Sequence, residues 1–323
     1  MKVCVFGAGA IGGFVAAELA RAQIDVSVVA RGAHLSAMRE RGLRLRIGGE
    51  EHVVHPRCTD EPEHLGVQDY LMIALKAHQI TDAVDSMRPL IGAHTCVVTA
   101  SNGLPYWYFY GSGAVRPGTT LESVDPGGKQ WRVLGPERAV GCVVFPAAEV
   151  VAPGVIRHEH GRRFPIGEPD GTKTSRIDAL HRMFTDAGLE APIRSDIRHE
   201  IWLKLWGNLC FNPVSALTLA TVDAIARDPG TRALCKAMMA EASAIGERLD
   251  LHLRVDADRR IDGIAALGPH KMSMLQDLEQ GRSLEVEPLV GVVQELGRLV
   301  DVPTPTVDLV LALIRQRTRG TLQ

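Results

Sequence analysis

The first part of the chain alternates short apolar runs with segments of helical spacing. Short apolar runs predict buried strands, and apolar residues three or four positions apart predict amphipathic helices. We predict strands over 3–6, 25–30, 70–74 and 96–99, helices over 11–21, 34–41 and 80–87, and a hairpin of 43–47 with 51–55. Such βαβ alternation predicts a mostly parallel sheet covered by helices.

The pattern changes twice further on. Residues 140–166 are β-rich and interrupted by Pro and Gly, which predicts later strands of the same domain, followed by a helix over 174–187. From Asp196 onward long helical periodicities dominate, and they predict helices over 199–212, 223–226, 231–249 and 306–319, with two more between 271 and 300. We therefore predict an α/β Rossmann-like domain over 1–195 and an all-α domain over 196–323, with a ligand cleft between them.

Composition narrows the class of partner. With 36 Lys and Arg against 38 Asp and Glu, the formal net charge is −2, which is no electrostatic footprint for nucleic acid or an anionic membrane. A small-molecule partner is favoured. The chain begins directly with a strand pattern, and no run approaches the roughly 20 apolar residues of a membrane span, so we expect a cytoplasmic protein.

Metal binding finds little support in the sequence. The six cysteines form no CxxC pair and no zinc-ligand spacing with histidines. His158 and His160 flank Glu159 in a strand-like context, but a third ligand is missing. We expect reduced thiols and no metal.

A glycine loop follows the first strand directly and opens a helix. Gly7, Ala8, Gly9, Ala10, Ile11 and Gly12 form a GxGxxG pattern in the context that identifies a dinucleotide-binding turn. The first glycine permits the turn, the second lets the backbone approach a pyrophosphate, and the third lets the helix pack on the strand. The helix N-terminus then presents free N–H groups to the phosphates.

The end of the second strand selects between the two nicotinamide cofactors. NAD-selective sites place Asp or Glu there to bind the ribose 2′-hydroxyl. This strand ends at Arg31, whose planar guanidinium is suited to a 2′-phosphate. The sequence therefore predicts NADP(H), with a plain surface arginine as the alternative interpretation.

A polar stripe marks one helix of the second domain. Lys204, Asn208 and Asn212 lie four residues apart among apolar neighbours, so they share one face of the helix. Polar groups on a largely buried helix need partners, and a substrate with a carbonyl and a carboxylate would supply them. In the alternative interpretation Lys204 reaches solvent and the asparagines bond locally, with Asn212 as a cap before Pro213.

Five motifs occur together in this order. They are residues 7–12, Leu75-Lys76-Ala77-His78-Gln79, Ser101-Asn102-Gly103, the Lys204–Asn208–Asn212 helix, and Ser273-Met274-Leu275-Gln276-Asp277 with Gly281-Arg282 and Glu285. Together they resemble the ketopantoate reductase (2-dehydropantoate 2-reductase) family over nearly the whole chain. The resemblance implies NADPH-dependent reduction of a 2-oxo acid to a 2-hydroxy acid, and a place in pantothenate biosynthesis.

The resemblance also implies roles for individual residues. Lys204 would be the catalytic proton donor and Glu285 the carboxylate that interacts with it. Substrate would be bound by Asn208, Asn212, Ser273 and Asn102, and Lys76 and Asn102 would lie beside the cofactor. Hydride transfer to a ketone leaves negative charge on its oxygen, and a lysine ammonium stabilises that charge and delivers the proton. Lys76 is a rival proton donor.

Two departures from the family pattern leave the substrate open. Tyr106–Tyr110 is a run of five aromatic residues after Asn102-Gly103, which is either a wall of the substrate pocket or a packing or dimer surface. The role of the loop at 121–128 is open. Leu284 precedes Glu285 where the family often has a small hydroxyl residue. The alternatives to ketopantoate reduction are a relative that reduces a bulkier 2-oxo acid and a non-catalytic NADP(H) sensor. A homodimer is a further expectation.

Overall fold

The computed structural model describes residues 1–321, which form two compact units. One unit contains residues 1–112 and 128–198, and the other contains residues 113–127 together with the chain from His199 onward. The sequence-based division fell after Ser195 and assigned residues 113–127 to the first domain. In the structure this segment belongs to the helical unit instead.

The first unit is built on a seven-stranded sheet in the order β11–β8–β7–β6–β1–β2–β5. All neighbouring strands are parallel except β11, which runs antiparallel to β8. The mostly parallel sheet expected from the alternating pattern is thereby confirmed. The strands are β1 (Lys2–Phe6), β2 (Asp25–Val29), β5 (Arg57–Thr59), β6 (Tyr70–Ile73), β7 (Cys96–Thr99), β8 (Ala139–Cys142) and β11 (Ile166–Gly167).

A second, four-stranded sheet has the order β4–β3–β10–β9. It contains β3 (Leu43–Ile47), β4 (Glu50–Val54), β9 (Ala147–Ala152) and β10 (Val155–His160). The predicted hairpin is β3–β4, and its turn residues Gly48 and Gly49 have φ of 58° and 86°, which glycine adopts without strain. Two of the strands expected within residues 140–166, β9 and β10, belong to this sheet, because β10 pairs parallel with β3.

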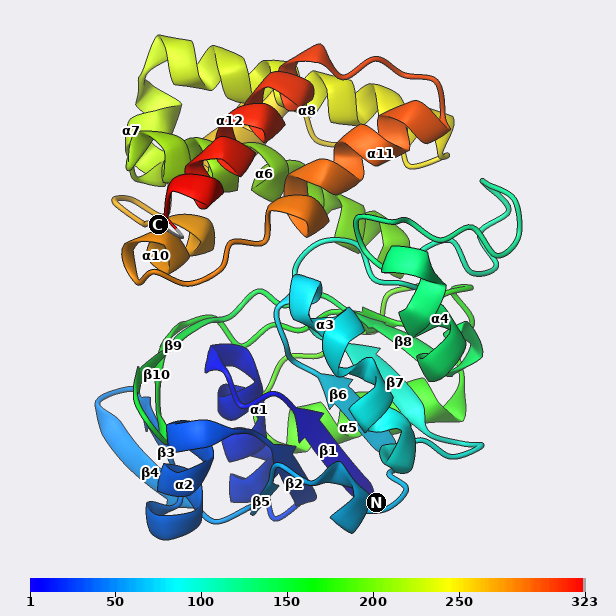
Figure 1. The fold of residues 1–323 in the computed structure, drawn as a ribbon, viewed down its shortest axis with the longest axis vertical. Coiled ribbons are helices and arrows are strands. Elements are labelled where there is room, and N and C mark those ends of the chain that lie inside the picture. Colours follow the sequence, from blue (N-terminus) through cyan, green and yellow to red (C-terminus); the bar gives the residue numbers. More distant parts are fainter. Residues whose placement is uncertain (322–323) are drawn as a thin grey trace. The chain divides into compact units, whose positions relative to one another are not determined.

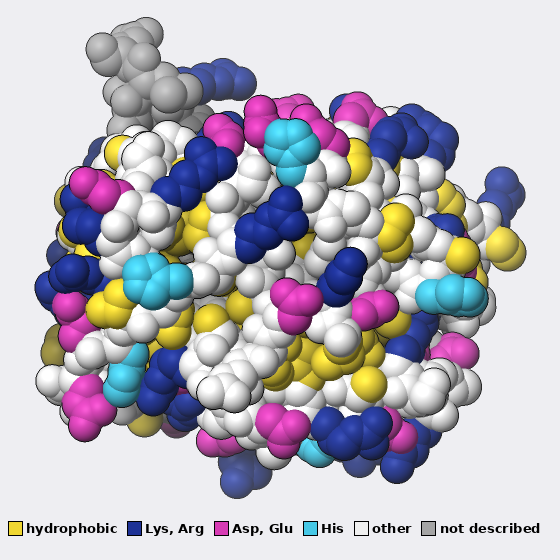
Figure 2. Space-filling view, turned by 90° about the horizontal axis from the view of Figure 1, so that it is seen from below, with side chains coloured by type: hydrophobic (Ala, Val, Ile, Leu, Met, Phe, Trp, Pro, Cys, Tyr) yellow, Lys and Arg dark blue, Asp and Glu magenta, His cyan; other side chains and the backbone are white. Residues whose placement is uncertain are grey.

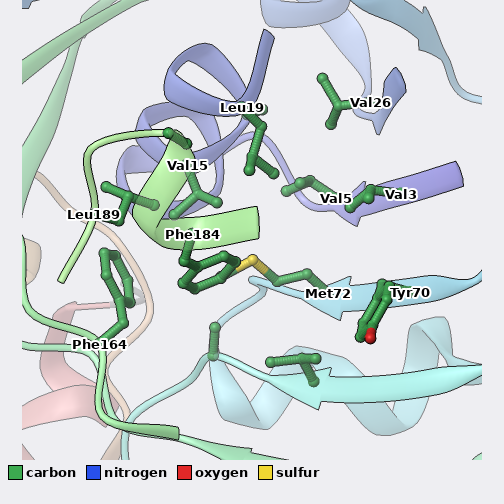
Figure 3. Packing of buried hydrophobic residues seen from close by; sticks show 14 of the residues in the cluster. Val3, Val5, Val15, Leu19, Val26, Tyr70, Met72, Phe164, Phe184 and Leu189 are labelled. Atoms are coloured by element: carbon green, nitrogen blue, oxygen red, sulfur yellow. The ribbon is translucent and has the colours of Figure 1, made fainter. Parts of the chain in front are cut away.

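Helices cover the main sheet. They are α1 (Ala10–Arg21), α2 (Gly32–Arg41), α3 (Ala77–Ala83), α4 (Lys129–Leu134) and α5 (Ser175–Asp186). Val15 and Leu19 of α1 and Phe184 of α5 lie over β1 and β6, and Figure 3 shows how these side chains fill one layer. Successive residues of a strand point to opposite faces, so residues two positions apart share a face. Val3 and Val5 therefore both point into this layer. The loops that follow β1, β2, β6 and β7 leave the sheet at its carboxyl edge (Figure 1).

The aromatic run Tyr106–Tyr110 packs within the first unit. Its first four residues are buried, and Tyr110 is 38% exposed. Trp107 Nε1 donates to Thr99 Oγ1 at 3.1 Å, Tyr106 Oη donates to the carbonyl of Gly135 at 3.2 Å, and Tyr108 Oη donates to the carbonyl of Arg198 at 3.1 Å. Of the two interpretations, the packing surface is therefore the one that the structure supports.

The second unit is helical, as predicted. It contains α6 (Ile197–Thr218, whose first two residues belong to the first unit), α7 (Val222–Arg227), α8 (Pro229–Arg248), α9 (Ala257–Ala265), α10 (Ser273–Glu279), α11 (Val292–Leu299) and α12 (Pro305–Thr321), with a π-helical turn over Glu287–Gly291. Helix α6 continues through Pro213, where the sequence predicted its end.

In the view of Figure 2, Lys and Arg side chains are interspersed with Asp and Glu, and neither sign gathers into one field. Within residues 1–321 no helix is long and apolar enough to cross a membrane. The same residues contain no cluster of three or more His, Cys, Asp or Glu that would hold a metal ion.

Candidate functional site

Four neighbouring parallel strands end at the loops that carry the predicted cofactor residues. β1 leads into Gly7–Gly12, β2 into Arg31, β6 into Lys76, and β7 into Asn102. Since β7, β6, β1 and β2 are adjacent in the sheet, their carboxyl ends share one edge. Open α/β sheets bind ligands outside this edge, so the first unit gathers its sequence-predicted residues where a dinucleotide is expected.

The three glycines of the loop have different environments. Gly7 has a φ of 104°, and a Cβ there would lie 2.8 Å from Leu75 Cδ2. A Cβ on Gly12 would lie 1.9 Å from the carbonyl oxygen of Gly7 and 2.9 Å from Ala74 Cβ, so only glycine lets α1 approach β1 and β6. Gly9 is exposed and has no atom within 4 Å of its Cβ position. The loop is therefore tightly packed against the protein at Gly7 and Gly12, and it has free space beside Gly9.

The N-terminus of α1 is available to an anion. Gly9 is the N-cap residue, no side chain caps the helix, and no acidic residue lies in the first turn. The leading N–H groups of a helix have no intrahelical acceptor, and the helix dipole favours negative charge there. These features fit the pyrophosphate of a nicotinamide dinucleotide.

Arg31 occupies a second helix start. It is the exposed N-cap residue of α2, whose first turn also lacks an acidic residue. Among residues 1–321 its side chain forms no ion pair. A cationic fork beside free helix N–H groups suits a phosphate better than a ribose hydroxyl.

His34, which the sequence did not single out, lies in the first turn of α2. Its Nδ1 accepts a hydrogen bond from the backbone N–H of Gly154 at 2.9 Å, so the helix is tied to the turn between β9 and β10. Its Nε2 is buried, and burial lowers the pKa of the imidazole more than the nearby backbone of Ala8 raises it. No local pattern connects positions 34 and 154.

In the helical unit, Lys204, Asn208 and Asn212 lie on α6, with Lys204 and Asn208 half-buried and Asn212 fully buried. Asn212 Oδ1 accepts hydrogen bonds from Ser273 Oγ and from the backbone N–H of Met274, each at 3.1 Å. Two of the predicted substrate residues are thus in contact. Asn212 is no helix cap, because α6 continues past it, and its Nδ2 is buried with no acceptor among residues 1–321.

Glu285 lies in the segment that follows α10. Arg282 Nε donates to Asp277 Oδ1 at 2.8 Å and the Arg282 backbone N–H donates to the Asp277 carbonyl, so Gly281, at a φ of 64°, turns the chain back along α10. Glu285 follows as a buried carboxylate, 7% exposed. The next turn is π-helical, and Arg315 binds both carboxylate oxygens of Glu287 there, at 2.7 and 2.6 Å. The motif residues Asp277, Gly281 and Arg282 therefore close the C-terminal end of α10, a few residues before Glu285.

The fold and the glycine loop define a Rossmann-type oxidoreductase that uses a nicotinamide cofactor, and comparison with known proteins places it more closely. Residues 3–115 match the family model described as Ketopantoate reductase PanE/ApbA, and residues 196–318 match the model of the C-terminal part of the same family. The chain belongs to the ketopantoate reductase family.

Individual relatives agree with this assignment. A 2-dehydropantoate 2-reductase of Mesorhizobium japonicum is 56% identical over 98% of this chain and 97% of the relative. A solved structure from Ralstonia solanacearum MolK2 has a TM-score of 0.93 at 41% identity, covering 99% of this chain and 98% of that one. A D-mandelate dehydrogenase solved with NADH and anilino(oxo)acetate has a TM-score of 0.86 at 18% identity, with 99% of each chain covered, and shows the shared fold alone.

Proposed function

We propose that this protein reduces 2-dehydropantoate (ketopantoate) to pantoate with NADPH. Family membership and the 56% identity to a 2-dehydropantoate 2-reductase support the substrate. Arg31 at the start of α2, in a site without a competing carboxylate in the first turn, supports NADPH over NADH. The residues of the glycine loop, Arg31, Lys76 and Asn102 would hold the cofactor, which supplies the hydride when bound.

The single observation that carries the proposal is the orientation of Asn212. Its amide oxygen is occupied by α10, so its Nδ2 is left as a buried donor without an acceptor. A buried donor without an acceptor costs free energy, which a substrate oxygen would recover. The donor lies on the same face of α6 as Lys204 and Asn208, where an oxo acid would find three donors in a row.

The proposed chemistry assigns Lys204 the proton transfer. Its ammonium stabilises the negative charge that develops on the ketone oxygen and donates the proton that completes the hydroxyl group. Glu285, buried and preceding the π-helical turn, keeps the ammonium protonated, since a neighbouring negative charge favours the charged form of lysine. Asn208, Asn212, Ser273 and Asn102 would bind the other polar groups of the substrate.

The test follows NADPH oxidation with ketopantoate and with bulkier and aromatic 2-oxo acids. We expect ketopantoate to be the best substrate, and Lys204→Ala to lower kcat by about 10²–10⁴-fold, the usual contribution of a general acid. Lys236→Ala is the matched control, because Lys236 is a half-exposed lysine of the same unit, paired with Asp258. Full activity of the Lys204 variant would refute the assigned mechanism.

Two alternatives are decided by the same panel. Turnover of only an aromatic oxo acid would favour a relative with another substrate, as in the D-mandelate dehydrogenase of the same fold. NADPH binding without turnover of any oxo acid would favour a sensor. The expectations of a homodimer and of a cytoplasmic location stay predictions, and light scattering tests the first.

A further inference from the structure

A second cation lies against α6, supplied by Arg260 of α9. Its Nη2 donates to the backbone carbonyl of Leu203 at 3.3 Å. A Cβ placed on Gly207 would lie 3.3 Å from both Nε and Nη2 of this guanidinium. Glycine inside a helix costs about 1 kcal/mol relative to alanine, and here it leaves the space in which the guanidinium lies.

Arg260 differs from the other charged residues around it. On another face of α9, Asp258 and Asp262 both pair with Arg232 at 2.8 Å, and Asp258 also pairs with Lys236. Arg260 forms no ion pair with any residue from 1 to 321, and its Nε is buried without an acceptor. Burial also lowers the pKa of its guanidinium. A desolvated cation without a counter-ion is costly, and a bound anion would offset that cost.

The guanidinium lies against the turn of α6 that carries Lys204, the residue to which we assign proton transfer. Gly207 follows Lys204 by three residues, and such positions are neighbours on a helix surface, with Cβ atoms about 5–6 Å apart. Asn208 and Asn212, with Ser273 bonded to the latter, lie on the other side of Lys204 around the helix. Lys204 is therefore flanked by a cation on one side and by neutral amides on the other.

We propose that Arg260 binds the carboxylate of the 2-oxo acid. This inference rests on the proposed function and names the anchor that the reaction needs. The carboxylate and the keto group of a 2-oxo acid are on adjacent carbons, so their oxygens require donors that are side by side. The ammonium of Lys204 donates to the keto oxygen, and the planar guanidinium of Arg260 donates to the carboxylate. The amides on the opposite flank then remain for the neutral, hydroxyl-bearing part of the substrate.

The experiment compares an acid with its neutral analogue. Initial rates are measured with the 2-oxo acid that the wild type reduces best and with the primary amide of that acid, for wild type, Arg260→Gln and Arg259→Gln. Arg259 is the adjacent, exposed arginine of α9 and serves as the matched control. We expect Arg260→Gln to raise KM for the acid by about 10–100-fold, as for the loss of a charge-assisted hydrogen bond, and to leave KM for the amide unchanged.

A second variant covers the case in which Arg260→Gln does not fold. Gly207→Ala adds a Cβ that would lie 3.0 Å from Ile264 Cδ1 and 3.3 Å from the guanidinium, so it displaces Arg260 while its charge is kept. We expect KM for the acid to rise less than in Arg260→Gln, and KM for the amide to stay unchanged. The ratio of KM for the amide to KM for the acid is compared among the variants. If Arg260→Gln and Gly207→Ala give the same ratio as Arg259→Gln, the proposal is overturned and the reductase function is left intact.

Failure of the proposed function is recognised separately. If the wild type reduces no oxo acid, binding of the unreactive anion oxamate in the presence of NADPH is measured by calorimetry. Binding that is lost in Arg260→Gln and kept in Arg259→Gln would support the anionic site. Absence of binding, or equal binding in both variants, would overturn it.

Discussion

Ser273 and Asn212 are joined by a hydrogen bond of 3.1 Å between the serine hydroxyl and the amide oxygen, which connects the start of α10 to the middle of α6. The backbone N–H of Met274 reaches the same oxygen at 3.1 Å. Because both donors bind the same atom, that atom is the amide oxygen Oδ1, and the other atom is the nitrogen Nδ2. The Nδ2 group is consequently held as a donor, which is the preorganisation that the proposed substrate site requires.

Asn212→Asp tests this orientation. The aspartate keeps an acceptor for Ser273 and Met274 but replaces the donor with a second oxygen, so we expect folding to be retained and kcat/KM for the oxo acid to fall by about 100-fold or more. Ser273→Ala removes one of the two fixing bonds and should cost about 1 kcal/mol of unfolding free energy, with a smaller effect on kcat/KM. For both variants, steady-state rates give kcat/KM and thermal unfolding gives the change in stability. Equal losses in the two variants would argue against a fixed amide.

Gly12 and Gly9 of the loop are expected to respond differently to substitution by alanine. Gly12→Ala places a Cβ 1.9 Å from a backbone oxygen, so it should lower the unfolding free energy by about 3 kcal/mol or more. Gly9→Ala meets nothing within 4 Å and should unfold almost like the wild type. Its methyl group would instead occupy space that the pyrophosphate needs, and we expect NADPH affinity to fall by about 10–100-fold. Thermal unfolding without cofactor and NADPH titration separate the two effects, and an unchanged NADPH affinity of Gly9→Ala would contradict the assigned site.

Arg31→Ser is expected to change the choice of cofactor. Without the guanidinium the 2′-phosphate loses its cationic partner, so Kd for NADPH should rise by about 10–100-fold while Kd for NADH stays the same. Arg41→Ser removes an equal charge from the other end of α2 and serves as the control. Fluorescence titration with both cofactors gives the ratio. A parallel loss of both affinities in Arg31→Ser would indicate a damaged helix and no 2′-phosphate contact.

Local patterns predicted most of the fold, and they also gave the candidate residues in each of the two units. The parallel strands, the β3–β4 hairpin and the long helices follow from apolar periodicity and turn residues, which act over a few positions. The glycine loop was identifiable because its GxGxxG spacing lies within a single βα turn, directly after a strand and at the start of a helix. The stripe of Lys204, Asn208 and Asn212 was visible because helical spacing alone puts these residues on one face.

Features that depend on distant contacts were not visible in the sequence. Residues 113–127 join the helical unit, where the carboxylate of Glu295 accepts the backbone N–H groups of Glu122 and Ser123 at 2.7 and 2.9 Å. This contact spans more than 170 positions, so the loop at 121–128 had no assigned role. Helix α6 passes through Pro213 because the surrounding core holds it, although proline predicts an end. Arg260 was likewise missed, since its partners on α6 are set by packing alone.

His34 gives the structure a dependence on acidity that local sequence would not predict. Burial lowers its pKa from the ordinary value of 6.5. Its Nδ1 also accepts the N–H of Gly154, so this nitrogen carries no proton in the folded state. The unfolded chain therefore binds a proton at this position more readily than the folded one. By linkage, the contribution of His34 to stability is fully present above about pH 6.5 and is lost as the pH falls toward the lower folded-state pKa.

His34→Asn isolates that contribution. The Oδ1 of asparagine can take the place of Nδ1 as acceptor for Gly154, and asparagine does not titrate. We expect the melting temperature of the wild type to fall more steeply between pH 7.5 and 5.5 than that of the variant, because all other titrating groups are common to both. Parallel curves would show that His34 is not protonated on unfolding. Convergence of the two curves at low pH would instead confirm the protonation of His34. A protonated His34 loses the hydrogen bond that ties α2, and with it Arg31, to the β9–β10 turn.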